Sequence, residues 1–431
     1  MADIRWFAST PESEAVAQVQ QTASMPFVKH VAVMPDVHYG KGSTVGTVIA
    51  TQGAVMPACV GVDIGCGMIA VRTNLNVADV RAKAKEIREG IERRIPVGIG
   101  PYGMNNNIHP SAARRIAILE EHQAREGINM DVRFKDWRKQ LGSLGGGNHF
   151  IEVCVGKEVA RNPDGDVLAE RIDNDEVWVI LHSGSRAVGN KTGSHWTKVA
   201  QAQAKRYQYD QWLPNPDLAY LIEQSQEYHD YIKELKWCQM FALLNREEMM
   251  DRVLWELNCT VLGVKATVTN VPCDHMDGCL APVVTFEKNP PIELERINCH
   301  HNFSKIENIN GQNFLITRKG AIEAREGMRA LIPGSMGARS YIVTGLGNPG
   351  SLFSAPHGAG RRMSRTKARA NFTKEGLTEL MQGLNIESRV REAVVDEHPG
   401  AYKDIDTVME EAKELVRPTH VLSQIINVKG D

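Results

Sequence analysis

Apolar residues follow two periodicities along this chain, and each periodicity predicts a different kind of element. Short runs rich in Val and Ile that end at turn signals predict strands; these runs are Val31–Met34, Val45–Ala50, Val177–Leu181 and Tyr341–Thr344. Apolar residues spaced three and four apart predict helices; these segments are Val77–Ile95, Ala112–Ala124, Thr197–Trp212, Asp217–Asn258, Thr373–Met381 and Asp404–Leu415. The two patterns together predict an α+β fold.

The helical pattern is most extensive between residues 197 and 258, where it predicts a long helical hairpin broken near Pro214-Asn215-Pro216. The chain has no Pro/Ser/Gly-rich linker, no block of like charge and no internal repeat, so nothing in it marks a domain boundary. We therefore expect a single domain over residues 1–431, with 197–258 as a helical excursion.

Glycine is clustered rather than spread. The clusters are Gly40–Gly46, Gly61–Gly67, Gly142–Gly147, Gly184–Gly189, Gly334–Gly337 and Gly345–Gly360. Glycine serves where the backbone takes a positive φ or approaches a ligand closely. Since predicted strands lie between these clusters, we expect the strands to deliver glycine-rich active-site loops to one place.

Charge and composition limit the classes of partner that this protein can bind. The chain carries 50 Lys+Arg against 52 Asp+Glu, a net charge of −2, so a polyanion must be held by a local patch. No apolar run approaches the roughly 18–20 residues that cross a bilayer, so we expect no membrane partner. Eight scattered cysteines and a start without a signal segment predict reduced thiols and a cytoplasmic protein.

Several segments carry residues that bind metals. Asp63 and Cys66 stand three apart in a glycine-flanked turn, His149 follows a triple glycine, and His182 ends an apolar strand. The segment Asn298-Cys299-His300-His301-Asn302 supplies another imidazole. Alone, the first pair is more often a buried Cys beside a solvated Asp. Together, these mixed carboxylate, thiolate and imidazole donors predict a transition-metal cluster.

A further histidine has a different setting. His357 lies in a glycine-rich turn followed by arginines at 361, 362 and 365, a spacing typical of a helix start that collects phosphate. This context predicts a nucleophilic or phosphate-transferring imidazole. The nearby Gly345–Gly350 matches GxGxxG, but no helix pattern follows it, which argues against a dinucleotide site.

From Met34 to the C-terminus the chain resembles the RtcB-type RNA ligases. The matching motifs are PDVHYGKGSTVG, VGVDIGCGM, LGGGNHFIE, LHSGSR, NCHHN, TRKGA, PGSMGARSYIV and SAPHGAGRRMSR. The resemblance implies the α+β fold of that family, with mixed β-sheets. It also implies ligation of RNA 2′,3′-cyclic phosphate or 3′-phosphate ends to 5′-hydroxyl ends, through a GMP–histidine intermediate and an RNA-3′-pp-G species, in RNA repair or tRNA splicing.

The resemblance also implies roles for individual residues. Two Mn²⁺ ions would be held by Asp63, Cys66, His149, His182 and His301, with Cys66 bridging, and His357 would take up GMP from GTP. Nucleotide-binding positions fall on Asp36, Asn148, Glu152, Ser335, Ser340, Gly360, Tyr402 and Lys429. Among them, Tyr402 would stack on guanine and Lys429 would reach the guanine edge. RNA phosphates would meet Arg186 and Arg361.

Other interpretations stay open beside the ligase. One is a manganese-dependent phosphoesterase that only opens cyclic phosphates, and another is a non-catalytic protein that binds RNA ends. Residues 259–296 exceed what the family core needs; we expect a surface insertion, with a zinc site at Cys259, Cys273, His275 and Cys279 as the alternative. The resemblance is compatible with an archease-like activator and with several cleaved RNAs. We expect the last five residues to be peripheral.

Overall fold

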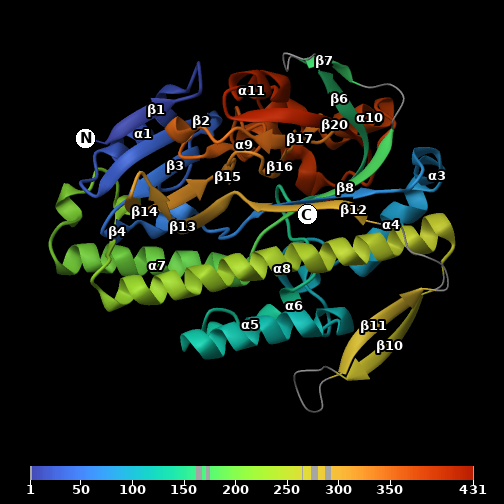
Figure 1. Ribbon diagram of the computed structural model, residues 1–431, viewed down its shortest axis with the longest axis horizontal. Helices are drawn as coiled ribbons and strands as arrows, with labels where there is room; N and C mark the ends of the chain where they lie inside the picture. Colours follow the sequence, from blue (N-terminus) through green and yellow to red (C-terminus); the bar gives the residue numbers. More distant parts are fainter. Residues whose placement is uncertain are drawn as a thin grey trace.

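The structure, a computed structural model, describes residues 2–161, 167–170, 175–264, 266–272, 280–286 and 293–430. The chain forms both helices and strands, and the strands gather into two main sheets with long helices along one side (Figure 1). This confirms the α+β prediction. Each of the four predicted strands lies within an observed strand.

The smaller main sheet has five strands in the order β1-β2-β3-β14-β13. Their bounds are Asp3–Trp6, Val28–His38, Val45–Thr51, Gln312–Lys319 and Asn302–Ile309. β1 runs parallel to β2, whereas the other pairs are antiparallel, so this sheet is mixed.

The larger sheet follows the order β12-β5-β8-β6-β20-β17-β16. The bounds in that order are Glu293–His300, Gly67–Thr73, Glu176–Ser183, Phe150–Arg161, Val416–Lys429, Ser340–Gly345 and Arg329–Ile332. β8 lies between β5 and β6, and all its residues after Glu176 are buried. A strand covered on both faces needs a continuous apolar run, which is the pattern that Val177–Leu181 shows.

Two long helices cover one side of the sheets (Figure 1). α7 spans Arg186–Arg206, and α8 spans Gln226–Leu262 and packs against α7, β5 and β8. Ser225 caps the start of α8 by accepting from the Tyr228 N–H, and Gly263 ends it in the left-handed conformation. α5, Ala113–Glu126, packs on α8 as well.

The helical hairpin is confirmed, but its predicted bounds are wrong. α7 begins eleven residues before Thr197, whereas the connection from 207 to 225 contains the predicted break near Pro214-Asn215-Pro216. The part of α7 before Thr197 contains Gly189 and Gly193, which lower its helix propensity. Packing outweighs that cost, because a Cβ at Gly193 would lie 3.3 Å from the Gly61 carbonyl oxygen.

Other helices match more closely. The segment Val77–Ile95 forms two helices, α3 (Val77–Ala82) and α4 (Ala84–Arg94), because Lys83 leaves helical geometry and its ammonium donates to the Thr260 carbonyl, 2.8 Å away. The C-terminal pair is α10, Lys374–Gly383, and α11, Ile405–Glu411. In the described part of the chain, no helix has the length and apolar character to cross a membrane.

The C-terminal residues are not peripheral, since Asn427 and Val428 are buried in β20 and pair with β6. α8 extends to Leu262, so the first residues of the predicted insertion, including Cys259, belong to this helix. Beyond α8, strands β10 (Ala266–Pro272) and β11 (Leu280–Phe286) form a hairpin. Cys273, His275 and Cys279 lie outside the described residues.

Candidate active site

The predicted metal donors meet where four adjacent strands of the larger sheet begin or end. β5 begins where β8 ends, because Gly67 pairs with Ser183, and β6 begins there too, because Phe150 pairs with His182. β12 ends at the same edge, where His300 pairs with Gly67. Cys66, His149 and His301 each stand directly beside one of these strand ends. The strand order therefore brings together donors that are far apart in sequence.

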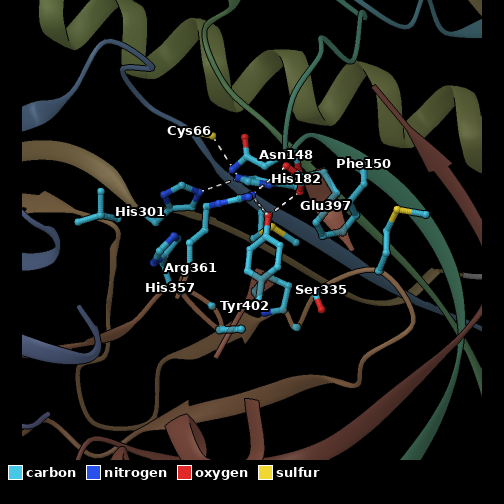
Figure 2. Close-up of a pocket in the computed structure, with 18 of the residues that line it drawn as sticks. Cys66, Asn148, Phe150, His182, His301, Ser335, His357, Arg361, Glu397 and Tyr402 are labelled. Atoms are coloured by element: carbon cyan, nitrogen blue, oxygen red, sulfur yellow. Dashed lines mark hydrogen bonds and ion pairs between the residues drawn. The ribbon is translucent and has the colours of Figure 1, made fainter. Parts of the chain in front are cut away.

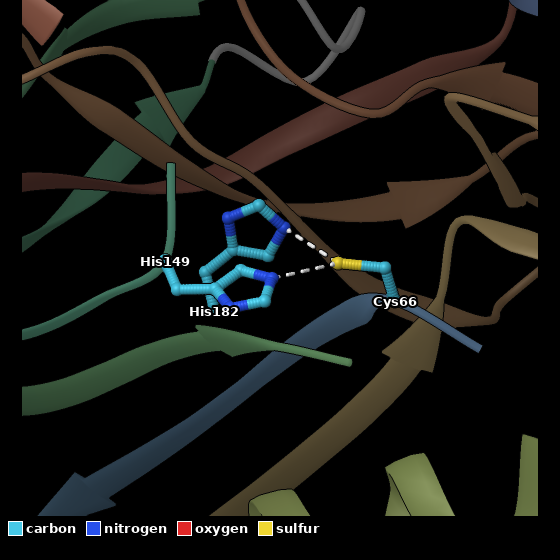
Figure 3. A group of neighbouring side chains, drawn as sticks. All are labelled: Cys66, His149 and His182. Carbon is cyan, nitrogen blue, oxygen red and sulfur yellow. Dashed lines mark hydrogen bonds between the residues drawn. The ribbon is translucent and has the colours of Figure 1, made fainter. Parts of the chain in front are cut away.

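The donor atoms lie within contact distance of one another. The Cys66 sulfur is 3.5 Å from Nε2 of His149 and 3.2 Å from Nε2 of His182 (Figure 3). Nε2 of His182 is 2.8 Å from Nε2 of His301, and Nε2 of His149 is 3.0 Å from a carboxylate oxygen of Asp63. All five predicted donors thus form one cluster.

The hydrogen bonds made by Nδ1 of the histidines indicate which kind of ligand the cluster can bind. Nδ1 of His149 lies 2.9 Å from the Leu144 carbonyl oxygen, and Nδ1 of His182 lies 3.1 Å from the Asn148 carbonyl oxygen. Because each Nδ1–H donates to a carbonyl, each Nε2 turns a lone pair toward Cys66. Burial lowers the pKa of His182 and keeps the ring neutral. Converging lone pairs repel unless a cation lies between them, so the cluster fits a divalent transition metal.

Two polar residues of α8 support the loops that carry these donors. The Arg246 guanidinium, wholly buried, donates to the carbonyls of Gly65 and Ser183 at 2.9 and 3.0 Å. Its Nε donates to Asn298 at 2.8 Å. The neighbouring Asn245 accepts from the Gly142 N–H at 2.7 Å. Our sequence reasoning missed both residues, because polar residues inside a helix do not reveal which face is buried.

His357 lies beside this cluster and has a partner of its own. Its Nδ1 donates to a carboxylate oxygen of Asp36 at 2.6 Å, and its backbone N–H donates to the same oxygen at 3.1 Å. Asp36 is fully buried in β2. The ring centroid of His357 is 4.8 Å from that of His301. With Nδ1 occupied by a proton, Nε2 of His357 is free to act as a nucleophile.

One cavity of about 260 Å³ joins His357 to the donor cluster (Figure 2). Of the predicted residues, Asp63, Cys66, Asn148, Glu152, His182, His301, Ser335, His357, Gly360, Arg361, Tyr402 and Lys429 line it. Ser340 does not line it; its hydroxyl lies behind the wall and accepts from the Gly334 N–H at 3.3 Å. Gly360 has φ +71°, and a Cβ there would collide with the Asp36 backbone.

One part of the cavity wall is built around Glu397, a residue that sequence reasoning missed. The Tyr402 hydroxyl donates to Glu397 at 2.6 Å, and the Lys429 ammonium lies 3.1 Å from the same carboxylate. Burial alone would raise the pKa of Glu397, but Lys429 and Arg365 lower it to about 2. Arg361 donates to the Tyr402 hydroxyl at 3.0 Å and lies over its ring (Figure 2).

Glu152 is a second carboxylate on the cavity wall. One of its oxygens accepts from the Asn427 amide at 2.8 Å, and the other is buried without a hydrogen-bond partner. Burial raises the pKa of Glu152 to about 8, although Lys429 opposes this shift. A carboxyl group that keeps a free oxygen on a cavity wall can accept a hydrogen bond from an N–H donor.

Arg186 stands apart from this cavity. It begins α7 with φ +59°, an uncommon conformation for a residue with a side chain. Its guanidinium donates to Ser143 at 3.2 Å and to the carbonyls of Gly98 and Gly103 at 3.2 and 3.0 Å. Arg186 lines a second cavity of about 390 Å³, together with Asp63 and His149.

Comparison with known proteins gives concordant matches. A family model described as "tRNA-splicing ligase RtcB" matches residues 18–430. The RNA-splicing ligase RtcB of Escherichia coli K12 is 39% identical, over 99% of this chain and 96% of that protein. The tRNA-splicing ligase RtcB of Nanoarchaeum equitans is 29% identical over 95% of this chain and 88% of its own length. The RNA-splicing ligase RtcB of Mycobacterium bovis is 29% identical over 96% of this chain.

Proposed function

Starting from the fact that this chain belongs to the RtcB family and is an RNA ligase of RNA repair and tRNA splicing, we propose how it joins RNA ends. It joins a 3′-phosphate end, or a 2′,3′-cyclic phosphate end after hydrolysis, to a 5′-hydroxyl end at the expense of GTP. The observation that carries this proposal is the buried Asp36–His357 pair beside the donor cluster.

The donor cluster is the proposed site of two Mn²⁺ ions. Asp63, Cys66, His149, His182 and His301 would hold them, with Cys66 shared. Bound there, the ions would supply Lewis acidity and positive charge to the phosphate oxygens of GTP and RNA.

His357 carries the first step of the proposed mechanism. Nε2 attacks the α-phosphorus of GTP, forming an N–P bond while the P–O bond to pyrophosphate breaks. The ring gains positive charge in this step. Asp36, which accepts the Nδ1–H, holds the ring orientation and stabilises that charge, as a carboxylate does behind a catalytic imidazole. The product is histidine-linked GMP.

Two transfers complete the ligation. An oxygen of the RNA 3′-phosphate attacks the GMP phosphorus, and the N–P bond to His357 breaks, which restores the neutral imidazole. The 5′-hydroxyl of the second RNA then attacks the phosphorus of the RNA 3′-phosphate, forming the phosphodiester and releasing GMP. Neither transfer needs another side chain as nucleophile.

The part of the cavity around Glu397 and Tyr402 is the proposed guanine pocket. The Tyr402 ring would stack on the base. Its hydroxyl donates to Glu397 and accepts from Arg361, and these hydrogen bonds fix the position of the ring. Glu152 offers its free oxygen to the N1–H and N2–H donors that guanine has and adenine lacks at that edge. Lys429 lies over the Phe150 ring and would complete the edge contact. The wall residues Asn148, Ser335 and Gly360, with Ser340 behind, would shape the pocket.

RNA contacts follow from the cationic side chains. Every nitrogen of the Arg361 guanidinium is engaged by protein oxygens, so it would act on a phosphate through its charge. Arg186 would contact an RNA phosphate in the second cavity. The proposal also includes an archease-like activator, which would raise turnover. It places the enzyme in the cytoplasm, consistent with free thiols at the described cysteines.

Ligation with labelled RNA tests the proposal. One RNA ends in a 2′,3′-cyclic phosphate and the other begins with a 5′-hydroxyl; we expect joining only with GTP and Mn²⁺. We expect His357→Ala to open the cyclic phosphate but not to join the strands. Joining without GTP would contradict the proposed GMP–histidine mechanism, and cyclic phosphate opening as the only reaction of the wild type would favour the phosphoesterase alternative.

A further inference from the structure

The loop that joins β2 to β3 lies beside the nucleotide cavity, the one of about 260 Å³. The residues at the two ends of this loop, His38 and Val45, both line that cavity. Between them, Tyr39 and Lys41 are exposed, and Tyr39 keeps 61% of its surface accessible to solvent. In the described part of the chain, the Tyr39 ring has no aromatic partner and its hydroxyl makes no hydrogen bond. The loop therefore presents an aromatic ring and a cation to solvent next to the cavity.

Two buried side chains hold the backbone of this loop in place. The Gln18 amide accepts from the Gly40 N–H at 3.1 Å and donates to the Gly40 carbonyl at 2.5 Å. The Lys319 ammonium donates to the carbonyl of Lys41 and, at 2.8 Å, to that of Ser43. Because the backbone is already fixed, a ligand that binds the two exposed side chains does not have to order the loop.

The charges around the loop favour an anion. Lys319 lines the nucleotide cavity, and burial lowers its pKa to about 8, with the nearby charge of Lys41 adding to the shift. Asp217 opposes the shift, but its carboxylate already accepts from the Gln201 amide at 3.2 Å. In the described residues Lys41 has no carboxylate partner. Like charges repel, and an anion bound beside them removes that repulsion, so this loop suits a phosphate.

An exposed ring and an exposed cation two residues apart suit single-stranded nucleic acid. Bases stack on aromatic side chains, and cations contact the phosphates between them. A docking surface for a protein would need a continuous apolar patch, whereas Tyr39 is followed by Gly40, Lys41 and Gly42. The chain as a whole has a net charge of −2, so RNA depends on local contacts of this kind.

The position of the loop relative to His357 indicates which RNA strand it meets. Asp36, which accepts from Nδ1 of His357, lies on β2 two residues before His38, and the loop follows directly. In the proposed mechanism, the RNA 3′-phosphate must reach the GMP on His357. The nucleotides that precede this phosphate therefore leave the cavity on the side where β2 and β3 are joined.

We propose that Tyr39 and Lys41 bind the last nucleotides of the RNA strand that ends in the 3′-phosphate, with Tyr39 stacked on a base and Lys41 at a phosphodiester. The proposal rests on the proposed ligase mechanism and adds an RNA contact outside the nucleotide cavity. Because stacking accepts any base, the site should have little sequence preference.

Binding and joining by Tyr39→Ala test the proposal. Fluorescence anisotropy on Mn²⁺-loaded protein without GTP should show the Kd of a short 3′-phosphate strand raised about tenfold, since a stacked base is lost. Tyr39→Phe keeps the ring and should bind as the wild type does. In joining assays, the KM for the 3′-phosphate strand should rise about tenfold, while the KM for the 5′-hydroxyl strand stays unchanged. GMP uptake from GTP should match the wild type, because Tyr39 does not line the nucleotide cavity.

Lys41→Gln tests the phosphate contact. The salt dependence of binding to the 3′-phosphate strand should weaken by about 0.7 in log–log slope, the value for one lost contact to single-stranded nucleic acid. Lys205 and Tyr207 supply matched controls, because they have the same spacing, are both exposed and do not line the cavity. Tyr207 is 60% exposed, close to the value for Tyr39. Tyr207→Ala and Lys205→Gln should both keep wild-type binding.

Three results would overturn the proposal. The first is wild-type binding of the 3′-phosphate strand by Tyr39→Ala, which would leave the exposed ring to a protein partner. The second is an equal rise of the two KM values, and the third is an equal loss of binding in Tyr207→Ala, which would mean that any exposed aromatic residue contributes. If the wild type takes up no GMP, the proposed function fails, whereas the anisotropy comparison still decides whether this loop binds the 3′-phosphate strand.

Discussion

Asp36→Asn tests the pairing on which the nucleophile depends. The substitution keeps the shape of the side chain but removes its negative charge, so the Nδ1–H of His357 loses a charge-assisted acceptor at 2.6 Å. A hydrogen bond to a charged group contributes about 1.5–3 kcal/mol. If this energy is gained as the imidazole becomes positive, the loss slows GMP uptake by roughly ten- to a hundredfold, at about 1.4 kcal/mol per tenfold.

The same substitution has a local structural cost. The second oxygen of Asp36 is buried without a partner, so the amide group of the introduced asparagine would point there with no acceptor. An unpaired buried donor costs about 1–3 kcal/mol. The protein should still fold, with metal content equal to wild type, because Asp36 is not one of the donors.

Single-turnover labelling with excess [α-³²P]GTP measures the first step in this variant. RNA that already carries the 3′-pp-G end bypasses His357 and supplies the control, and Asp36→Asn should seal it at the wild-type rate. Wild-type labelling kinetics in Asp36→Asn would refute the reasoning. So would an equal loss of rate on the pre-activated RNA, because it would mean that Asp36 acts on the whole site.

Three further predictions follow from the site. Arg246→Met leaves the Gly65 and Ser183 carbonyls unpaired. It should lower Mn²⁺ affinity about ten- to a hundredfold and the free energy of unfolding by about 1–3 kcal/mol for each unpaired carbonyl. Calorimetric Mn²⁺ binding equal to wild type would contradict this. Tyr402→Ala should raise the GTP concentration required for labelling about ten- to a hundredfold, since base stacking is worth about 1–3 kcal/mol. Tyr402→Phe keeps the ring and should show a much smaller increase. Equal increases in the two variants would argue against stacking. Burial raises the pKa of Glu152 from 4.5 to about 8, so the unfolded chain releases this proton first and stability should fall as pH rises across that window. In denaturant titrations of metal-free protein, Glu152→Gln should lack this component, and identical pH profiles would count against it.

Local sequence patterns identified the side chains that meet in the donor cluster better than the residues that support them. Cys66, His149 and His182 stand at strand ends next to glycines, and both signals are local. Their convergence depends on the order β5-β8-β6, which no local pattern specifies. Asn245 and Arg246 went unnoticed, because their buried hydrogen bonds exist only once α8 packs under the loops.

Tertiary packing also explains the errors in the fold prediction. Gly189 and Gly193 lower the helix propensity of the segment before Thr197, yet close approach to the loop at Gly61 favours α7 there. Glu397 had no motif of its own, and its role in the cavity depends on Tyr402 and Lys429, whose contacts with it form only in the folded chain. Long-range contacts of this kind leave no periodic trace in a sequence.

The central claim is that His357 is the nucleophile that takes up GMP, and mapping the adduct tests it most directly. After incubation with GTP and Mn²⁺, mass spectrometry should locate one acid-labile GMP on the peptide that contains His357. His357→Ala should carry no adduct while it retains wild-type Mn²⁺ content. An adduct on another residue, or one that persists in His357→Ala, would contradict the account.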